Sequence, residues 1–282
     1  MKRTYRVLWF VVSVIVVVTG CGLTFSYDTG IFRATVGDAT SAAVKLDLSS
    51  HDTTIHALSD SSMLFDARLD YIGEIKFDVR GQVEKRVNLK EDSNNRYYAG
   101  IADLDWDIGL NAAIPLALML DASSGKLAAD LSTLTITSFD FEMGAGEAQI
   151  RLPRSGDAPM DARFDMGSGD VTVAIPDGTA LDFDTLQMGS GDLLFEVGRD
   201  ADFAVEVEMR SGTLIVDVPD DAAVQVTITE AGSGTFDRDI ALTQVEHGAL
   251  EGEGTWKTGN FDDANAHIVL SVQMDSGDLI VR

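Results

Sequence analysis

The chain has 282 residues, with 21 lysines and arginines against 46 aspartates and glutamates, and its formal net charge is −25. Such acidity argues against nucleic acid as a partner, because phosphate binding needs a basic surface. Cys21 is the single cysteine, so no intramolecular disulfide can form, and strand pairing and an apolar core must stabilise the fold.

The N-terminal residues are typical of an export signal. Lys2, Arg3 and Arg6 precede an uncharged, mostly apolar run, and small residues lead into Cys21. Cys21 stands where the bacterial lipoprotein signal, which this segment resembles, places its lipidated residue. A noncleaved membrane anchor is the alternative, because no charged residue lies between positions 7 and 27. In both cases we expect an extracytoplasmic chain that is anchored to a bacterial membrane.

The section that follows predicts β structure without a clear repeat. Apolar residues alternate over 44–48 and 75–79, which indicates half-buried strands. His51 stands in a turn where later segments have glycine, and we expect it to adopt the left-handed conformation.

This section also contains a basic cluster, which includes Lys85, Arg86 and Lys90. It predicts a solvated strand face. The alternative is a basic surface that faces anionic lipids or wall polymers.

A short motif recurs through the rest of the chain, most clearly as Met-Gly-Ser-Gly-Asp at 166–170 and 188–192. Copies follow one another after 20 to 23 residues, a period typical of solenoids. Alternating apolar residues after each copy indicate a strand. We expect the repeat glycines to form one column of corners, because glycine accepts positive φ and close backbone approach. They are Gly125, Gly146, Gly169, Gly191, Gly212, Gly234, Gly254 and Gly277. Arg238 departs from the pattern, since it falls in an inward phase.

Two other residue types recur at fixed positions in this motif. Methionine often precedes the glycine by three residues, which predicts a row of flexible side chains inside a narrow core; a thioether ladder for a soft metal is the alternative. An acid follows the glycine at Glu147, Asp170, Asp192 and Asp278. We interpret these acids as solvated corner residues rather than a cation column, because calcium-binding repeats of this kind have a nine-residue period. We therefore expect no metal and no cofactor.

Two segments resemble the toast-rack family: Asp-Trp-Asp-Ile-Gly-Leu-Asn at 105–111 with Ile-Pro-Leu-Ala-Leu at 114–118, and the stretch 134–146 that ends in Met-Gly-Ala-Gly. Gly-Asp-Ala at 37–39, before the strand at 44–48, resembles the start of that family's N-terminal domain. The repeats are also similar to "putative adhesin" domains and to the extracellular part of LiaF-type envelope-stress proteins. The resemblance implies a right-handed parallel β-helix-like body in the cell envelope and transfers no catalytic residue.

The fold that we predict is all-β, a solenoid with coils of about 22 residues. An antiparallel sandwich or barrel is the alternative, because strands spaced 8 to 12 residues apart fit it too. We divide the chain into a signal peptide (1–20), a tether (21–31), an N-terminal β domain (32–120) and the repeat solenoid (121–282).

The sequence contains no Ser-His-Asp grouping at a recognisable elbow, no metal-ligand cluster and no phosphate loop. We therefore predict a non-enzymatic envelope lipoprotein that acts as a scaffold or adhesion surface; an accessory of envelope-stress sensing that binds a membrane regulator is the alternative. A polysaccharide-cleaving β-helix is disfavoured, because the short period leaves little room for loops.

The expected partners are the membrane, through Cys21, and an envelope protein or polymer. Because the chain ends inside a strand, we also expect a homodimer through the terminal coil.

Overall fold

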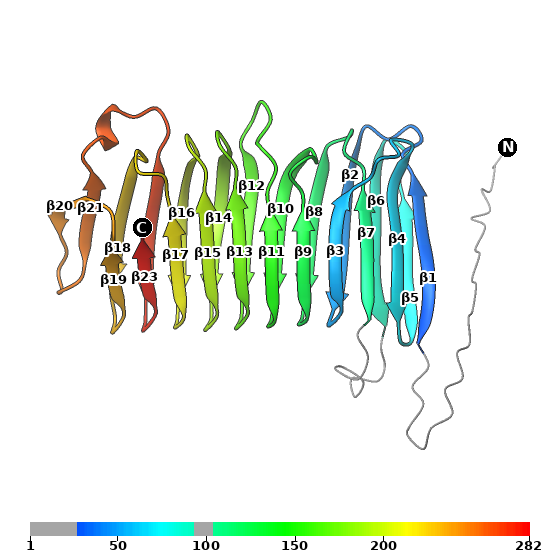
Figure 1. Cartoon of the computed structure of the whole chain (residues 1–282), viewed down its shortest axis with the longest axis horizontal. Coiled ribbons are helices and arrows are strands. Elements are labelled where there is room, and N and C mark those ends of the chain that lie inside the picture. The colour runs from blue at the N-terminus through cyan, green and yellow to red at the C-terminus, as the bar shows by residue number, and fades with distance from the viewer. Residues whose placement is uncertain (1–26, 93–103) are drawn as a thin grey trace, which may run out of the picture.

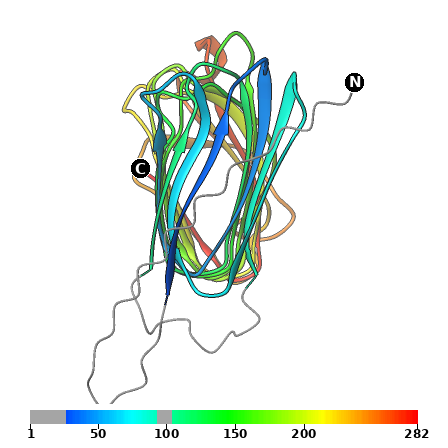
Figure 2. The ribbon, with the colours of Figure 1, turned by 90° about the vertical axis from the view of Figure 1, so that its right-hand side faces the viewer.

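The computed structural model describes residues 27–92 and 104–282. Cys21, with the expected signal peptide and most of the tether, lies outside these residues. The described chain forms two long β-sheets that face each other along an elongated body (Figures 1 and 2). Its one helical element is the short 3-10 helix η2 (Phe261–Asp263), and no helix in this part of the chain could span a membrane.

Eleven strands form the first sheet, which we name sheet A. In spatial order they are β1 (Asp28–Thr35), β4 (Met63–Tyr71), β7 (Asp105–Leu110), β3 (Asp52–Ala57), β9 (Lys126–Asp130), β11 (Glu147–Arg151), β13 (Asp170–Ile175), β15 (Asp192–Val197), β17 (Thr213–Asp217), β23 (Asp278–Val281) and β19 (Thr235–Arg238).

Twelve strands form the second sheet, sheet B. In spatial order they are β20 (Leu242–His247), β21 (Gly254–Thr258), β18 (Val224–Glu230), β22 (Ile268–Met274), β16 (Asp202–Met209), β14 (Ala180–Met188), β12 (Met160–Met166), β10 (Ile136–Met143), β8 (Leu116–Ala122), β2 (Ser41–Ser49), β6 (Glu84–Asp92) and β5 (Glu74–Arg80).

The middle of the body is a parallel solenoid. Each coil contributes one strand to sheet B and the next strand to sheet A, and neighbouring coils pair in parallel through both sheets. The pairing places Met166 opposite Met143 on one side and opposite Met188 on the other, so the sequence repeats stack in register. The prediction of an all-β solenoid is confirmed, and antiparallel pairing is confined to the two ends.

The core lies between the two sheets and follows directly from the alternating sequence. The strands of the solenoid turn every second side chain inward, and the buried methionines end its sheet B strands in one row. Phenylalanines pack against one another in the same core. The ring of Phe164 lies 6.0 Å from that of Phe141 and 5.9 Å from that of Phe195, and these contacts link neighbouring coils and both sheets.

Aromatic side chains close both ends of the solenoid. At the N-terminal end, Phe77 from β5 packs 5.6 Å from Phe32 and 5.4 Å from Phe65, between the sheets. At the other end, Phe236 meets Trp256 at 5.2 Å. Arg238 was expected to point inward, but it is exposed and lies over the rings of Phe236 and Trp256 at 5.6 and 5.7 Å. A charged side chain is tolerated at this normally inward position because β19 is the edge strand of sheet A.

The C-terminal coils do not stack in chain order. β22 lies between β16 and β18, and β23 lies between β17 and β19. The chain therefore builds the outer coil first, makes an excursion over 239–267 that contains the β20–β21 hairpin, and returns to fill the gap. The expectation of an exposed terminal strand is wrong, since β23 is paired on both sides. A homodimer stays a prediction, but it would have to form through an edge strand other than β23.

Both sheets continue from the N-terminal section into the repeats. β2 pairs with β8 and β3 pairs with β9, and the boundary expected between residues 120 and 121 falls inside β8. The N-terminal part differs from the repeats in its added antiparallel strands. Its first coil, however, pairs in parallel with the repeat strands in both sheets.

Candidate interaction surface

The repeat glycines meet at one corner of the coils. A Cβ at Gly146 would lie 2.2 Å from the carbonyl oxygen of Gly125, and one at Gly191 would lie 2.1 Å from that of Gly169. Such contacts link all the repeat glycines except Gly254. Gly254 begins β21 in the excursion, where its Cβ position is 2.4 Å from the carbonyl oxygen of Glu246. The motif around Gly254 matches the repeat in sequence. In the structure, however, this glycine lies against the backbone of the paired hairpin strand and not against a repeat glycine.

The acids that follow these glycines lie on the exposed corner of sheet A. Glu147, Asp170 and Asp192 are neighbours on adjacent strands, whereas Thr213 separates Asp192 from Asp278. The threonines act as partners of the acids. Asp192 Oδ1 accepts a hydrogen bond from the backbone N–H of Thr213 at 2.9 Å.

Asp278 shows the same arrangement at the next threonine. Its Oδ1 accepts from the backbone N–H of Thr235 at 3.1 Å and from the Thr235 hydroxyl at 2.6 Å. In the part of the chain that the structure describes, no group of three or more His, Cys, Asp or Glu side chains is placed to hold a metal ion.

The basic cluster of the sequence is divided between two faces of β6. Lys85 follows the inward phase, and its ammonium group donates to the carbonyl oxygen of Thr35. Arg86 and Lys90 point outward, and Lys90 Nζ lies 2.8 Å from Asp47 Oδ2. The structure thus brings two of the three residues onto one face and pairs one of these two with an acid.

A row of carboxylates crosses the outer face of sheet B instead. Asp47, Asp121, Glu142 and Asp165 are paired in register on the adjacent strands β2, β8, β10 and β12. Burial raises the pKa of the Asp121 carboxyl above its ordinary value, and the Asp47 and Glu142 carboxylates raise it further. These carboxylates are close enough to repel one another, because neighbouring strands lie only about 4.8 Å apart.

Arg163 offsets part of this repulsion. Its Nη1 lies 3.1 Å from Glu142 Oε1 and 3.4 Å from Asp140 Oδ1, and its Nη2 lies 3.6 Å from Asp165 Oδ2. Burial raises the pKa of Asp140, although the Arg163 guanidinium acts in the opposite direction. The next strands, β14 and β16, contain no lysine or arginine. Their exposed acids are Asp182, Asp184, Asp202, Glu206 and Glu208.

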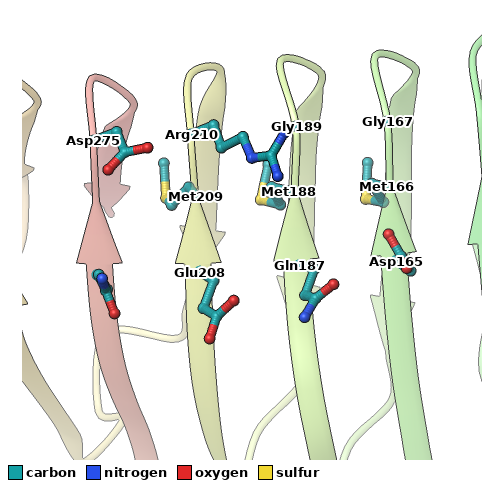
Figure 3. Close-up of a pocket in the computed structure, with 11 residues that line it drawn as sticks. Asp165, Met166, Gly167, Gln187, Met188, Gly189, Glu208, Met209, Arg210 and Asp275 are labelled. Atoms are coloured by element: carbon teal, nitrogen blue, oxygen red, sulfur yellow. The ribbon is translucent and has the colours of Figure 1, made fainter.

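The outer face of sheet B is hollowed where β12, β14, β16 and β22 end, with a volume of about 430 Å³. Asp165, Gln187 and Glu208 line it from neighbouring strands, and Arg210 extends from the next corner toward Gly189 (Figure 3). Gln273 and Asp275 complete the lining on the β22 side, so amides, carboxylates and one guanidinium converge on this space.

Glycine is what keeps this hollow open. Gly167 and Gly189 stand at the corner positions where a Cβ would lie 2.4 Å from a carbonyl oxygen of the preceding coil. Gly167 and Gly189 therefore place no side chain at this corner, whereas Arg210 and Asp275, at the equivalent positions of the next coils, line the hollow. The sequence analysis missed these lining residues, and the one signal that marks their positions is the repeat methionine that each outward residue directly precedes, as Gln187 precedes Met188.

A second polar site, inside the N-terminal coil, involves His51. Its Nε2 lies 2.7 Å from Glu91 Oε2, both side chains are almost fully buried, and the imidazole stacks on Trp106 at 4.9 Å. His51 was expected to occupy the left-handed region, but the residue with positive φ in this turn is Ser49, at 49°. His51 instead turns inward and meets an acid from β6.

The comparisons with known proteins locate the chain in a family. A family model described as the N-terminal domain of toast_rack, DUF2154, matches residues 24–174, more than half of the chain. No curated protein matches the chain in sequence.

Three solved structures resemble the chain over most of its length. A "putative cell adhesion protein" from Clostridium sporogenes is 15% identical, with a TM-score of 0.49, and the match covers 91% of this chain and 99% of that one. A "putative adhesin" from Bacteroides fragilis is 10% identical, with a TM-score of 0.40, over 91% and 98% of the two chains. Another from Parabacteroides distasonis is 12% identical, with a TM-score of 0.29, over 90% and 97%. These likenesses are too distant to assign a role, and the assignment follows from the family match alone: the chain belongs to the toast-rack family.

Proposed function

We propose that this chain is a non-enzymatic protein of the bacterial cell envelope, tethered to a membrane at its N-terminus, whose outer sheet B face acts as a scaffold or adhesion surface. The tether is supported by the basic residues, the apolar run and Cys21 at the start of the sequence. Stacked coils build broad surfaces from repeated positions, which is how solenoid proteins bind extended partners.

The observation that carries the proposal is the continuous row on sheet B. Asp121, Glu142 and Asp165 lead along adjacent strands into the hollow, where Gln187 and Glu208 continue the same register. A partner that lies across the strands would meet polar side chains about every 4.8 Å. Since the row offers mainly acceptor oxygens, it suits a partner that presents hydroxyl, amide or cationic donors.

A regulatory accessory that binds a membrane protein is the second candidate. The same face would serve that role, and the identity of the bound component separates the two functions. Recovery of a histidine kinase or another membrane regulator favours sensing. Recovery of wall polymer or surface proteins favours a scaffold or adhesion role.

The tether is tested by Cys21→Ser in cells that are fed labelled palmitate. We expect the wild-type protein in the membrane fraction with the label, and the variant without it, because the chain has no other cysteine to modify. An unlabelled wild-type protein that stays in the membrane fraction supports the noncleaved anchor instead. An unlabelled wild-type protein in the cytoplasmic fraction would refute the tether in both forms.

A further inference from the structure

The corner above the hollow has one position that successive coils fill differently. The backbone N–H groups of Gly167, Gly189, Arg210 and Asp275 each donate to the carbonyl oxygen of the methionine that ends the sheet B strand of the preceding coil in the stack. These four residues are therefore equivalent and lie about 4.8 Å apart along the stack. Two of them have no side chain, and the next two carry opposite charges.

Arg210 does not pair with Asp275, although the two residues stand on neighbouring coils. Its side chain extends the other way, into the space that Gly189 leaves open (Figure 3). In the part of the chain that the structure describes, the Arg210 guanidinium makes no ion pair and no side-chain hydrogen bond, and the same holds for the carboxylates of Glu208 and Asp275. One cation and two anions thus face the hollow without partners.

These charges limit what the hollow can bind. An anion would meet Arg210, but the two carboxylates and a chain with a formal net charge of −25 would repel it. A simple cation would meet the guanidinium that extends across the space. A ligand with one ammonium and one carboxylate group finds an opposite charge for each and adds no net charge.

The spacing of the charges fits a small ligand of this kind. Glu208 precedes Arg210 by two residues, which is about 6.6 Å along a strand. One short peptide can span this separation with its carboxylate and a side-chain amine. Asp165 is less suited to the amine, because its Oδ2 already lies 3.6 Å from Arg163 Nη2.

The rest of the lining suits the uncharged parts of a peptide. Gln187 lies between Asp165 and Glu208 in the outward row, and its amide can both donate and accept a hydrogen bond. Beneath it, the methionines of the core row form an apolar floor. Thioether side chains are flexible and adapt to irregular shapes, so this floor can accept the aliphatic part of a side chain.

We propose that the hollow is a binding site for a short peptide that carries one free amine and one free carboxylate. The Arg210 guanidinium binds the carboxylate over Gly189, Glu208 and Asp275 bind the ammonium group, and the Gln187 amide hydrogen-bonds to the peptide group. The cellular meaning of this site rests on the proposed function, because peptides of wall polymer present both groups in the cell envelope. The binding itself does not depend on that function.

The test is isothermal titration calorimetry of the full chain in detergent micelles with the dipeptide Nα-acetyl-Lys-Ala, which has one ammonium and one carboxylate. Two modified dipeptides remove these charges singly: a C-terminal amide removes the carboxylate, and acetylation of the lysine side chain removes the ammonium. We expect the wild-type protein to bind the unmodified dipeptide with a Kd of about 0.1 to 1 mM, and each modification to weaken binding about tenfold.

Protein variants connect each charge of the dipeptide with its partner. Arg210→Gln should weaken binding of the unmodified dipeptide about tenfold, and the C-terminal amide should then cause little further loss, because the partner of the carboxylate is already gone. The double variant of Glu208→Gln and Asp275→Asn should show the same pattern with the acetylated lysine. Arg151→Gln, on the outer face of sheet A, is the matched control and should bind as the wild-type protein does. Circular dichroism checks that these exposed substitutions leave the fold intact.

Three results would overturn the proposal. These are a wild-type protein that does not bind the dipeptide, equal binding of the dipeptide and its amide, and a loss in Arg151→Gln as large as that in Arg210→Gln. If the dipeptide does not bind while a photoreactive amino acid at Gln187 captures an envelope component in cells, the peptide site is refuted and the proposed surface stands. Binding in the calorimeter without capture in cells would support the site and refute its proposed role.

Discussion

Replacing Gly212 by alanine will lower the free energy of unfolding by more than about 2 kcal/mol, because two separate costs meet at this corner. Gly212 has φ of +110°, a conformation that a residue with a Cβ rarely adopts. The added Cβ would also lie 2.2 Å from the carbonyl oxygen of Gly191. That oxygen belongs to the backbone of the neighbouring coil, so the clash cannot be relieved by a side-chain rotation.

Three other glycines separate these two costs. Gly178 has φ of +68° with nothing within 4 Å, so alanine there measures the conformational cost alone. Gly191 has the close contact without the left-handed φ, and Gly156 has neither. Chemical denaturation should rank Gly212→Ala as the most destabilised, Gly178→Ala and Gly191→Ala as intermediate, and Gly156→Ala within about 0.5 kcal/mol of wild-type. A Gly212→Ala protein as stable as Gly156→Ala would contradict the corner geometry.

Replacing Glu91 by alanine will lower the free energy of unfolding by about 2 to 6 kcal/mol, because it leaves two groups without their hydrogen-bond partner inside the protein, each at a cost of about 1 to 3 kcal/mol. Glu91 is 7% exposed, and its Oε2 lies 2.7 Å from His51 Nε2. Its Oε1 accepts a hydrogen bond from the backbone N–H of Ile72 at 3.0 Å. Alanine would leave both of these groups without their partner inside the protein, whereas Glu91→Gln should retain part of the stability by preserving hydrogen bonds.

The chain offers a matched control for this pair on its surface. His56 Nε2 lies 3.0 Å from Asp107 Oδ1, but these side chains are 42% and 63% exposed. Asp107→Ala should therefore change the free energy of unfolding by less than about 1 kcal/mol. Equal losses in Glu91→Ala and Asp107→Ala, measured by denaturation at the same pH, would show that burial does not strengthen the His51 pair.

The sequence was sufficient to predict the solenoid because each coil repeats the same local chemistry. Met166 and Met188 end equivalent strands, and the glycines after them permit equivalent corners. The order of the last coils could not be predicted in this way. The motif at Gly254 has the spacing of a corner, yet the excursion over 239–267 uses it in a hairpin, and only the pairing of β23 with β17 and β19 reveals the inserted strand.

The candidate surface was harder to predict than the fold. Sequence reasoning singled out the acids after the glycines, and the structure places two of them, Asp192 and Asp278, beside threonine partners at one corner. The row that leads into the hollow occupies the outward phase of sheet B, where residues vary from Asp165 to Gln187 and show no fixed motif. His51 and Glu91 are 40 residues apart, and no local pattern indicates that they meet.

The most direct measurement of the proposed role is site-specific photo-crosslinking in cells from matched glutamines on the two faces. Gln187 is exposed in the hollow of sheet B, and Gln149 is exposed on the outer face of sheet A. A photoreactive amino acid at Gln187 should capture an envelope protein or wall polymer that the same probe at Gln149 does not. Capture from Gln149 alone, or from neither position in the membrane-tethered protein, would contradict the assignment of sheet B as the interaction surface.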